Sequence, residues 1–337
     1  MEVRVLSHSL IVHIGEKVLD GGDITWDEAR ALTQIEKVDI PLLLAMANKV
    51  REKFAGNEVE TCEIINARSG ACPEDCKFCA QSAHHDAEVA VYPLVSEEEI
   101  VAAARRAEEE GAHRFCIVTS GRGMEGDGDF PAILRAIKRI KRETSLEMCC
   151  SLGFLEEEHV VALKETGITR YHHNLETGKS FFPRICTTHS CEERLATIKR
   201  VKIAGLQVCS GGIIGMGENW EQRLEMAFAL RELDVDSVPI NILNPIKGTP
   251  LENETRLHPL EILQTFAIFR LILPAKIIRY AGGREVNLGD FVPRGLLSGI
   301  NGMLIGNYLT TRGRGAAEDL RMIRDLGLEP VGPARRN

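Results

Sequence analysis

The sequence has no excess of positive charge. Its 337 residues include 41 Lys and Arg against 49 Asp and Glu, which gives a formal net charge of −8. A protein that binds a phosphate backbone needs clustered, excess Lys and Arg. We therefore expect no nucleic-acid partner.

Long hydrophobic runs are also missing. The longest apolar stretch, residues 40–47, contains Pro41 and is far shorter than the ~20 residues that span a bilayer. The N-terminus shows no basic-then-apolar pattern of a secretion signal. These absences predict a cytoplasmic protein with no membrane partner.

Aromatic residues make up only 5% of the chain, but hydrophobic residues as a whole reach 44%, enough for a large core. Short β-like runs alternate with amphipathic helical runs. The candidate strands are residues 63–67, 114–119, 146–152, 169–175, 206–214, 237–243, 276–281 and 303–307. The helical runs between and after them are residues 96–110, 130–143, 156–165, 191–203, 220–233, 259–273 and 284–299.

Strict alternation of eight strands with helices favours a parallel (β/α)8 TIM barrel. A doubly wound open sheet fits the same alternation and is the alternative. Ser96, followed by three glutamates, has the pattern of a helix N-cap. Residues 1–60 are predicted to form a helical extension against one end of the barrel. The domains are then residues 1–60 (extension), 61–330 (barrel) and 331–337 (tail).

The ten cysteines, in a chain with no secretion signal, are more typical of metal ligation than of a disulfide framework. Cys72, Cys76 and Cys79 have C-x3-C-x2-C spacing. They can ligate three corners of a four-iron (4Fe-4S) cluster. Because such clusters normally take four thiolates, the site either lacks a distant ligand or binds a small molecule at the fourth iron.

Zinc and a disulfide are the alternative interpretations of this loop. Structural zinc sites usually show paired C-x2-C units or added histidines. Here one C-x2-C pair overlaps the C-x3-C pair, and no second pair follows. His84 and His85 lie close behind, which keeps zinc as an open alternative.

The whole loop, residues 66–82 (NARSGACPEDCKFCAQS), resembles the cluster loop of radical S-adenosylmethionine (SAM) enzymes. An aromatic residue commonly precedes the last cysteine in that superfamily, and Phe78 does so here. The version with Cys-Pro-Glu-Asp-Cys and a trailing Gln-Ser resembles the biotin synthase family in particular.

This resemblance implies a reaction. The cluster would chelate SAM, and one electron would break a carbon–sulfur bond of the sulfonium. The products would be methionine and a 5′-deoxyadenosyl radical, which abstracts hydrogen from an unactivated carbon. Two such abstractions, each using one SAM, would convert dethiobiotin to biotin. The cofactor carries that chemistry, while the protein positions it and excludes water.

A second set of residues supports the same reading. Cys116, Cys149 and Cys209 lie in the second, third and fifth predicted strands, and Arg279 lies in the seventh. Alternate strand residues point into a closed barrel, so these four can converge, although a buried cysteine is often only a small hydrophobe. Their local strings resemble those of biotin synthases, in which three cysteines and an arginine hold an auxiliary two-iron (2Fe-2S) cluster. The resemblance implies that a bridging sulfide of that cluster becomes the sulfur of biotin.

The binding residues also follow from the resemblance. In the segment YHHNLET (171–177), Asn174 and Glu176 match residues that contact SAM, although Glu176 replaces an aspartate. Arg194 matches an arginine near the SAM carboxylate. Asn241 matches the asparagine that faces the ureido ring of dethiobiotin, where an amide can both donate and accept. The alternatives are an ordinary strand end and, for Arg194, a solvated helix charge.

Four cysteines fit neither set: Cys62, Cys150, Cys186 and Cys191. Strand alternation directs Cys150 away from the barrel interior. They are either incidental thiols or help to hold an auxiliary cluster larger than two irons.

The resemblance further implies a homodimer and a flavodoxin- or ferredoxin-type electron donor. Two alternatives remain: another barrel-type radical SAM enzyme, such as a hydrogenase-maturation or amino-acid-mutating enzyme, and a non-catalytic iron–sulfur carrier. The four residues expected to hold the auxiliary cluster argue against another radical SAM enzyme. A carrier would not need Asn174 and Asn241.

Overall fold

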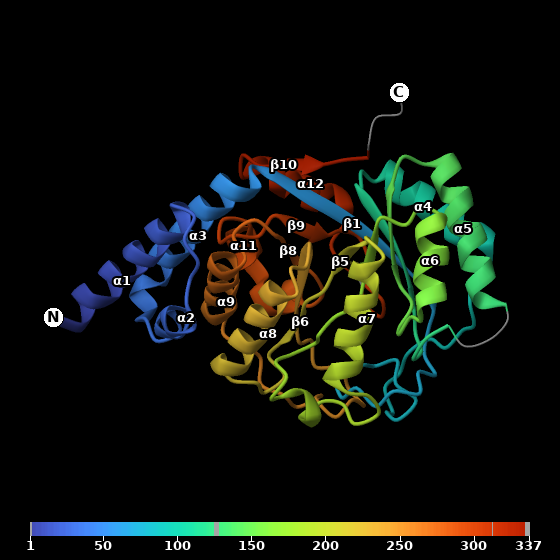
Figure 1. Cartoon of the computed structure of the whole chain (residues 1–337), viewed down its shortest axis with the longest axis horizontal. Helices are drawn as coiled ribbons and strands as arrows, with labels where there is room; N and C mark the ends of the chain where they lie inside the picture. The colour runs from blue at the N-terminus through green and yellow to red at the C-terminus, as the bar shows by residue number, and fades with distance from the viewer. Residues whose placement is uncertain (1, 125–127, 312, 334–337) are drawn as a thin grey trace.

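The strands pair in parallel, and the last strand of the ring closes onto the first (Figure 1). The computed structural model describes residues 2–124, 128–311 and 313–333. Its strands are β1 (Glu58–Arg68), β2 (Arg114–Thr119), β3 (Glu147–Ser151), β4 (Arg170–His172), β5 (Gln207–Cys209), β6 (Gly212–Ile214), β7 (Ser237–Ile242), β8 (Ile277–Tyr280), β9 (Gly302–Leu304) and β10 (Glu329–Val331). Since β9 pairs with β1, the predicted barrel is confirmed and the open sheet is wrong.

Helices alternate with these strands and surround the barrel. They are α1 (Glu2–Leu19), α2 (Trp26–Leu32), α3 (Ile40–Ala55), α4 (Glu97–Glu109), α5 (Asp129–Glu143), α6 (Glu157–Glu165), α7 (Cys191–Ile203), α8 (Trp220–Glu232), α9 (Pro259–Ile272), α10 (Arg284–Leu288), α11 (Val292–Leu296) and α12 (Ala316–Asp325), with short 3-10 turns η1 (Lys37–Asp39), η2 (Phe182–Arg184) and η3 (Gly289–Phe291). The predicted cap of α4 is confirmed, because Ser96 and Glu99 form a reciprocal capping box.

The predicted strand 206–214 is two strands, β5 and β6, which share the fifth position of the ring. The backbone N–H of Gly211 donates to Oδ1 of Asn174 (3.1 Å) instead of to a neighbouring strand. The chain also passes so close to β7 that a Cβ on Gly211 would lie 2.0 Å from the Pro239 carbonyl oxygen. Only glycine permits this approach, and the strand breaks there.

The predicted helix 284–299 is also interrupted. Gly289 has a φ of +50°, a left-handed conformation that ends α10, and Pro293 lies in the first turn of α11. Beyond the last predicted strand, α12 and β10 were not predicted. β10 pairs with the start of β1 outside the ring.

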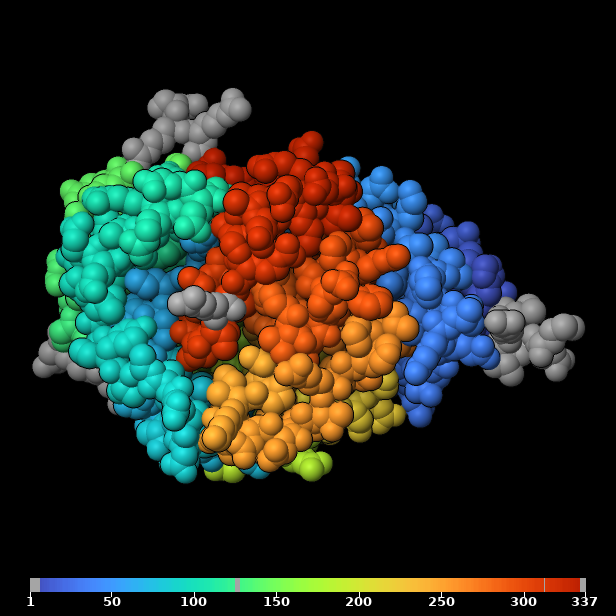
Figure 2. Space-filling model, turned by 180° about the vertical axis from the view of Figure 1, so that it is seen from behind, coloured from blue at the N-terminus to red at the C-terminus, as the bar shows by residue number. Residues whose placement is uncertain are grey.

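The N-terminal helices pack on the flank of the barrel, so the prediction that they cover one end is wrong. In Figure 2 they lie in blue against the orange segments of the C-terminal half. Gln264 of α9 donates to the carbonyl of Leu32 (2.8 Å), and Arg231 of α8 donates to that of Ile24 (2.9 Å). The boundary at residues 60 and 61 stays a prediction, and β1 begins before it, at Glu58. In the predicted tail, residues 334–337 lie outside the described residues.

Side chains alternate across the barrel wall. On β2, Phe115 and Ile117 are buried in the core shared with the helices, whereas Cys116 and Val118 lie in a separate cluster inside the ring. The outer apolar layer fixes the register of each strand, and with it the side chains that face inward. In the part of the chain that the structure describes, no helix combines the length and the apolar character needed to cross a membrane.

Candidate active site

A cavity of about 410 Å³ lies within the barrel, between the inward side chains of the strands and the loops that follow them. Most of the predicted site residues line it: Cys79, Cys116, Cys149, Asn174, Glu176, Cys209, Asn241 and Arg279. Cys72 and Cys76 lie on the same loop as Cys79, and Arg194 lies behind Asn174 and Glu176. The structure therefore brings the two predicted cysteine sets to one cavity.

The loop that follows β1 is closed on itself. The N–H of Cys72 donates to the carbonyl of Gln81 (3.0 Å), the N–H of Ala83 donates to the carbonyl of Cys72 (2.8 Å), and the N–H of Cys79 donates to the carbonyl of Cys76 (2.9 Å). These bonds hold three thiols on one short segment. All ten cysteines of the chain are free, so the disulfide interpretation is wrong.

A second segment, residues 185–189, clamps this loop. The carboxylate of Asp75 accepts from the backbone N–H groups of Thr187 (2.8 Å) and Thr188 (3.2 Å), and Glu74 accepts from the hydroxyl of Thr188 (2.5 Å). Burial raises the pKa of the Asp75 carboxyl, but the hydrogen bonds from Thr187, Cys186 and Thr188 outweigh it and leave the pKa well below its usual value. The charged Asp75 therefore fixes the loop between Cys72 and Cys76.

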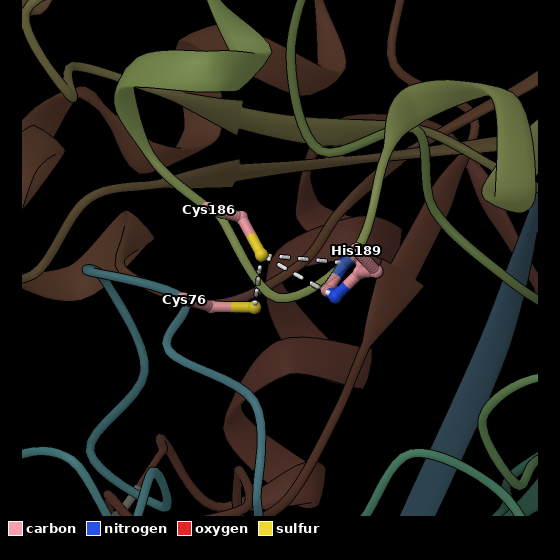
Figure 3. Close-up of side chains that lie close together, drawn as sticks. All are labelled: Cys76, Cys186 and His189. Carbon is pink, nitrogen blue, oxygen red and sulfur yellow. Dashed lines mark hydrogen bonds between the residues drawn. The ribbon is translucent and has the colours of Figure 1, made fainter.

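Cys186, which the sequence left unassigned, contacts the cluster loop directly (Figure 3). Its Sγ lies 3.8 Å from Sγ of Cys76 and 3.3 Å from Nδ1 of His189. The hydrogen bond with Cys76 lowers the pKa of Cys186 to about 4 against the effect of burial, and the same bond raises the pKa of Cys76. In this contact Cys76 is the donor and Cys186 the acceptor.

The histidines near the loop do not favour zinc. Cys76, Cys186 and His189 are close enough to hold one ion, but both ring nitrogens of His189 are occupied. Nδ1 lies 2.5 Å from a Glu74 carboxylate oxygen, and Nε2 accepts from Nε of Arg194 (3.0 Å). His84 and His85 hydrogen-bond to backbone carbonyls of the loop (2.9 and 3.0 Å). The donor set that remains, three thiols on one loop, fits an iron–sulfur cluster.

Asn174, Glu176 and Arg194 form one connected group. The amide of Asn174 donates to Glu176 (3.3 Å), and Arg194 donates to the backbone carbonyl of Asn174 (3.1 Å) and pairs with Glu176 (3.4 Å). Arg194 is buried, so its alternative interpretation as a solvated charge is wrong.

The backbone at this group is strained. Among the described non-glycine residues, only Ala71, Glu176 and Asp234 have positive φ. Ala71 precedes the first cysteine of the loop, and Glu176, at +71°, lines the cavity. Such conformations concentrate at functional sites because the surrounding structure must hold them in place. Two of the three strained residues thus belong to the candidate site.

Deeper in the barrel, Cys62, Cys116 and Cys149 form a buried cluster, and Cys209 and Arg279 line the cavity beside them. Cys62 is an addition to the predicted set. The sequence missed it because the predicted strand began at residue 63, whereas β1 begins at Glu58 and carries Cys62 into the ring. Cys150 packs in the outer core, as strand alternation predicted.

Two of the four thiols in this set, Cys149 and Cys209, have a lowered pKa. A hydrogen bond with Cys116 lowers the pKa of Cys149 to about 6 and raises that of Cys116. Burial raises the pKa of Cys209, but His172, whose Nδ1 is 3.4 Å from Sγ, and Arg279 outweigh it, so the net shift is downward. Burial raises the pKa of Cys62 to about 12. Metal ligands must be deprotonated, so Cys149 and Cys209 are the two thiols of the set whose surroundings favour the ligating form.

Arg279 is paired with the carboxylate of Glu60. It donates to Glu60 and to the hydroxyl of Ser237 (3.0 Å). Glu60 also accepts from Arg170 (2.6 Å) and lies 3.7 Å from Arg114. The sequence gave no signal for Glu60, which fell within the predicted extension.

Asn241 bridges two backbone segments at the cavity wall. Its amide donates to the carbonyl of Gly212 (3.3 Å) and accepts from the N–H of Gly282 (2.9 Å). A carboxamide has two N–H groups and two lone pairs on oxygen. One donor and one acceptor site therefore remain for a ligand.

A closed parallel barrel with a three-cysteine loop after its first strand defines a radical SAM enzyme, and residues 67–230 match the family model of the Radical SAM superfamily. Residues 239–329 match the Biotin and Thiamin Synthesis associated domain. The chain is 59% identical to biotin synthase of Carboxydothermus hydrogenoformans over 320 residues, which cover 95% of this chain and 98% of the relative. It is 55% identical to that of Clostridium acetobutylicum, with the same coverage. The chain belongs to the biotin synthase family.

Solved structures confirm the fold. Methylornithine synthase matches with a TM-score of 0.82 and 23% identity, over 96% of this chain and 97% of its own. HydG, a maturase of the [FeFe]-hydrogenase, matches with a TM-score of 0.81 and 18% identity, over 96% of this chain and 75% of its own. At these identities the likeness extends to the barrel and its helices alone.

Proposed function

We propose that the chain converts dethiobiotin to biotin by inserting one sulfur atom, with two SAM consumed per product. Two carbon–hydrogen bonds are replaced by two carbon–sulfur bonds, and the hydrogens leave in two molecules of 5′-deoxyadenosine, together with two methionines. One observation carries this proposal: a single cavity is lined both by the three-cysteine loop, at Cys79, and by a separate set of thiols and an arginine.

On the loop side, Cys72, Cys76 and Cys79 would hold a four-iron cluster, which when bound supplies the electron that cleaves SAM. Asn174 and Glu176 line the cavity beside that loop and can accept hydrogen bonds from a ribose. Arg194 holds both of them in place and supplies positive charge for a carboxylate. Asn241 offers its remaining donor and acceptor sites to a cyclic urea.

On the strand side, Cys116, Cys149, Cys209 and Arg279 would hold the auxiliary cluster that supplies the sulfur. Cys62 lies with Cys116 and Cys149 and gives the set a fourth thiol. A two-iron cluster held by three cysteines and an arginine leaves no role for that thiol. We therefore propose an auxiliary cluster larger than two irons.

Anaerobic reconstitution tests the function. We expect two distinct clusters in iron and sulfide counts and in Mössbauer spectra. We also expect methionine, 5′-deoxyadenosine and biotin when a reductant, SAM and dethiobiotin are supplied. A protein that binds only zinc, or that releases no methionine, would contradict the proposal.

Replacing Cys62 with Ala tests the larger cluster. We expect the variant to lose iron from the auxiliary cluster and to change its Mössbauer signature, while SAM cleavage without dethiobiotin stays within about twofold of wild type. The matched control is Cys150→Ala, which removes an equally buried thiol from the outer core. Equal iron content in the two variants would leave a two-iron cluster as the correct description.

The homodimer and the flavodoxin- or ferredoxin-type electron donor stay predictions from the resemblance, and the cytoplasmic location stays a prediction from the sequence pattern.

A further inference from the structure

Charged side chains lie next to the thiols of the auxiliary set, inside the barrel. On β1, Glu60 precedes Cys62 by two residues, and on β2, Arg114 precedes Cys116 by two residues. Side chains two positions apart on a strand point to the same side. Each of these thiols therefore has a charged side chain at the inward position just before it.

The same charged layer continues on two more strands. Arg170 of β4 pairs with Cys149 of β3 in the strand register, and Arg279 of β8 donates to Glu60. The three arginines line the cavity and are buried, with 4% (Arg114), 2% (Arg170) and 4% (Arg279) exposed. We call Glu60 and these three arginines the charged layer.

The charged layer has more positive charge than its carboxylate balances. Guanidinium groups stay protonated in proteins, so the layer holds three positive charges against the one negative charge of Glu60. Among the described residues that line the cavity, the one carboxylate is Glu176, which already pairs with Arg194. A buried charge without a partner is costly. The layer therefore calls for a further anion in the cavity.

Arg114 in particular lacks a full set of partners. Its Nη1 donates to the hydroxyl of Thr169 (2.8 Å), which donates in turn to the half-buried carboxylate of Glu147 (2.9 Å). Its Nη2 lies 3.7 Å from Glu60, farther than a hydrogen bond reaches. Its Nε is buried and has no hydrogen-bond partner among the described residues. Since buried polar groups are nearly always paired, this N–H indicates a ligand that the neighbouring side chains do not supply.

The neighbouring thiols supply negative charge when they bind metal. Cys62, Cys116 and Cys149 form one buried cluster, and Cys209 lines the cavity beside them. Cysteines ligate iron as thiolates, so an iron–sulfur cluster on these residues brings several negative charges to the layer. Its charge is of the sign and place that the arginines require.

Resting on the proposed function, we propose that Arg114 and Arg170 belong to the auxiliary-cluster site and that their charges balance the negative charge of the cluster and its thiolates. Glu60 is the positioning residue. Its two carboxylate oxygens accept from Arg170 (2.6 and 3.2 Å), and it also binds Arg279.

This role has a measurable consequence. Net charge helps to set the reduction potential of an iron–sulfur cluster. Positive charge nearby stabilises the reduced state, which is one electron more negative. The charged layer therefore helps to retain the auxiliary cluster and raises its potential.

The test is the midpoint potential of the auxiliary cluster in the anaerobic, reconstituted full chain carrying Cys72→Ala, with iron also counted in the wild-type background. In Arg114→Gln we expect a roughly tenfold shift toward the oxidised form, about 59 mV more negative for a one-electron couple, or loss of the auxiliary iron. Arg114→Lys keeps the charge and should stay close to the parent protein. Arg170→Gln and Arg170→Lys repeat the comparison on another strand.

Arg51→Gln is the matched control. Arg51 is 2% exposed and donates to Asn48 (3.0 Å) on α3, outside the ring, so its loss should change neither potential nor iron. Equal potentials and equal iron in Arg114→Gln and Arg51→Gln would overturn the inference. So would equal effects of Gln and Lys at both arginines, which would make shape rather than charge the cause. A wild-type chain whose iron and sulfide counts show a single cluster would refute the proposed function instead.

Discussion

Replacing Cys72 with Ala should abolish the reductive cleavage of SAM, with a loss of at least about 10³-fold in 5′-deoxyadenosine formed. The loop places its three thiols on one short segment closed by its own hydrogen bonds, and Cys186 already has a different partner in Cys76. Among the described residues, Cys186 is therefore not free to take over from Cys72. Since the cluster, rather than the protein, carries the hard chemistry, losing it removes the reaction instead of slowing it.

The measurement is 5′-deoxyadenosine and methionine released after anaerobic reconstitution with dithionite and SAM. Cys150→Ala is the control, because it removes a thiol that packs in the outer core, away from the cavity. The auxiliary cluster should persist in Cys72→Ala and be visible in its absorption spectrum. If SAM cleavage survived in this variant, the three-cysteine loop would not be the site of the chemistry.

The barrel could be predicted from sequence because its strands and helices alternate over the whole chain and few other topologies accept that pattern. Two predicted elements were wrong because each is interrupted at a glycine. Gly211 breaks the fifth strand through contacts with Asn174 and Pro239, and Gly289 ends a helix with a left-handed φ. Such breaks depend on tertiary neighbours, which local sequence patterns do not contain.

The site was predictable where residue spacing carries the chemistry. The C-x3-C-x2-C loop needs no tertiary information, and Cys116, Cys149, Cys209 and Arg279 were placed by strand alternation together with the resemblance. Cys62 was missed because its assignment depends on where β1 begins. Cys186 was missed because its contact with Cys76 joins residues 110 positions apart. Glu60 was missed for the same reason, since its role comes from three arginines on other strands.

Replacing Glu60 with Gln should cause a large loss of stability. Its carboxylate is the shared counter-charge of Arg114, Arg170 and Arg279, all of which are buried. Although burial raises the pKa of Glu60, the arginines, Arg279 first, outweigh it and hold the pKa well below its usual range. Removing one partner of a buried ion pair costs roughly 3–5 kcal/mol because the remaining charge is uncompensated. Urea unfolding of the metal-free protein at pH 7 should show a loss of this size.

The difference between wild type and Glu60→Gln should also depend on pH. A carboxyl whose pKa is depressed by folding contributes its full stability above its unfolded pKa, about 4.3, and loses it as the pH falls toward the folded pKa. The gap between the two proteins should therefore be constant from pH 7 to about 5 and shrink below about 4.3. Glu58→Gln, exposed at the start of the same strand, is the control and should change stability by less than about 0.5 kcal/mol. If the difference in unfolding free energy stayed the same at every pH, the loss of stability would come from the packing of the amide. The negative charge of Glu60 would then not be what stabilises the three arginines.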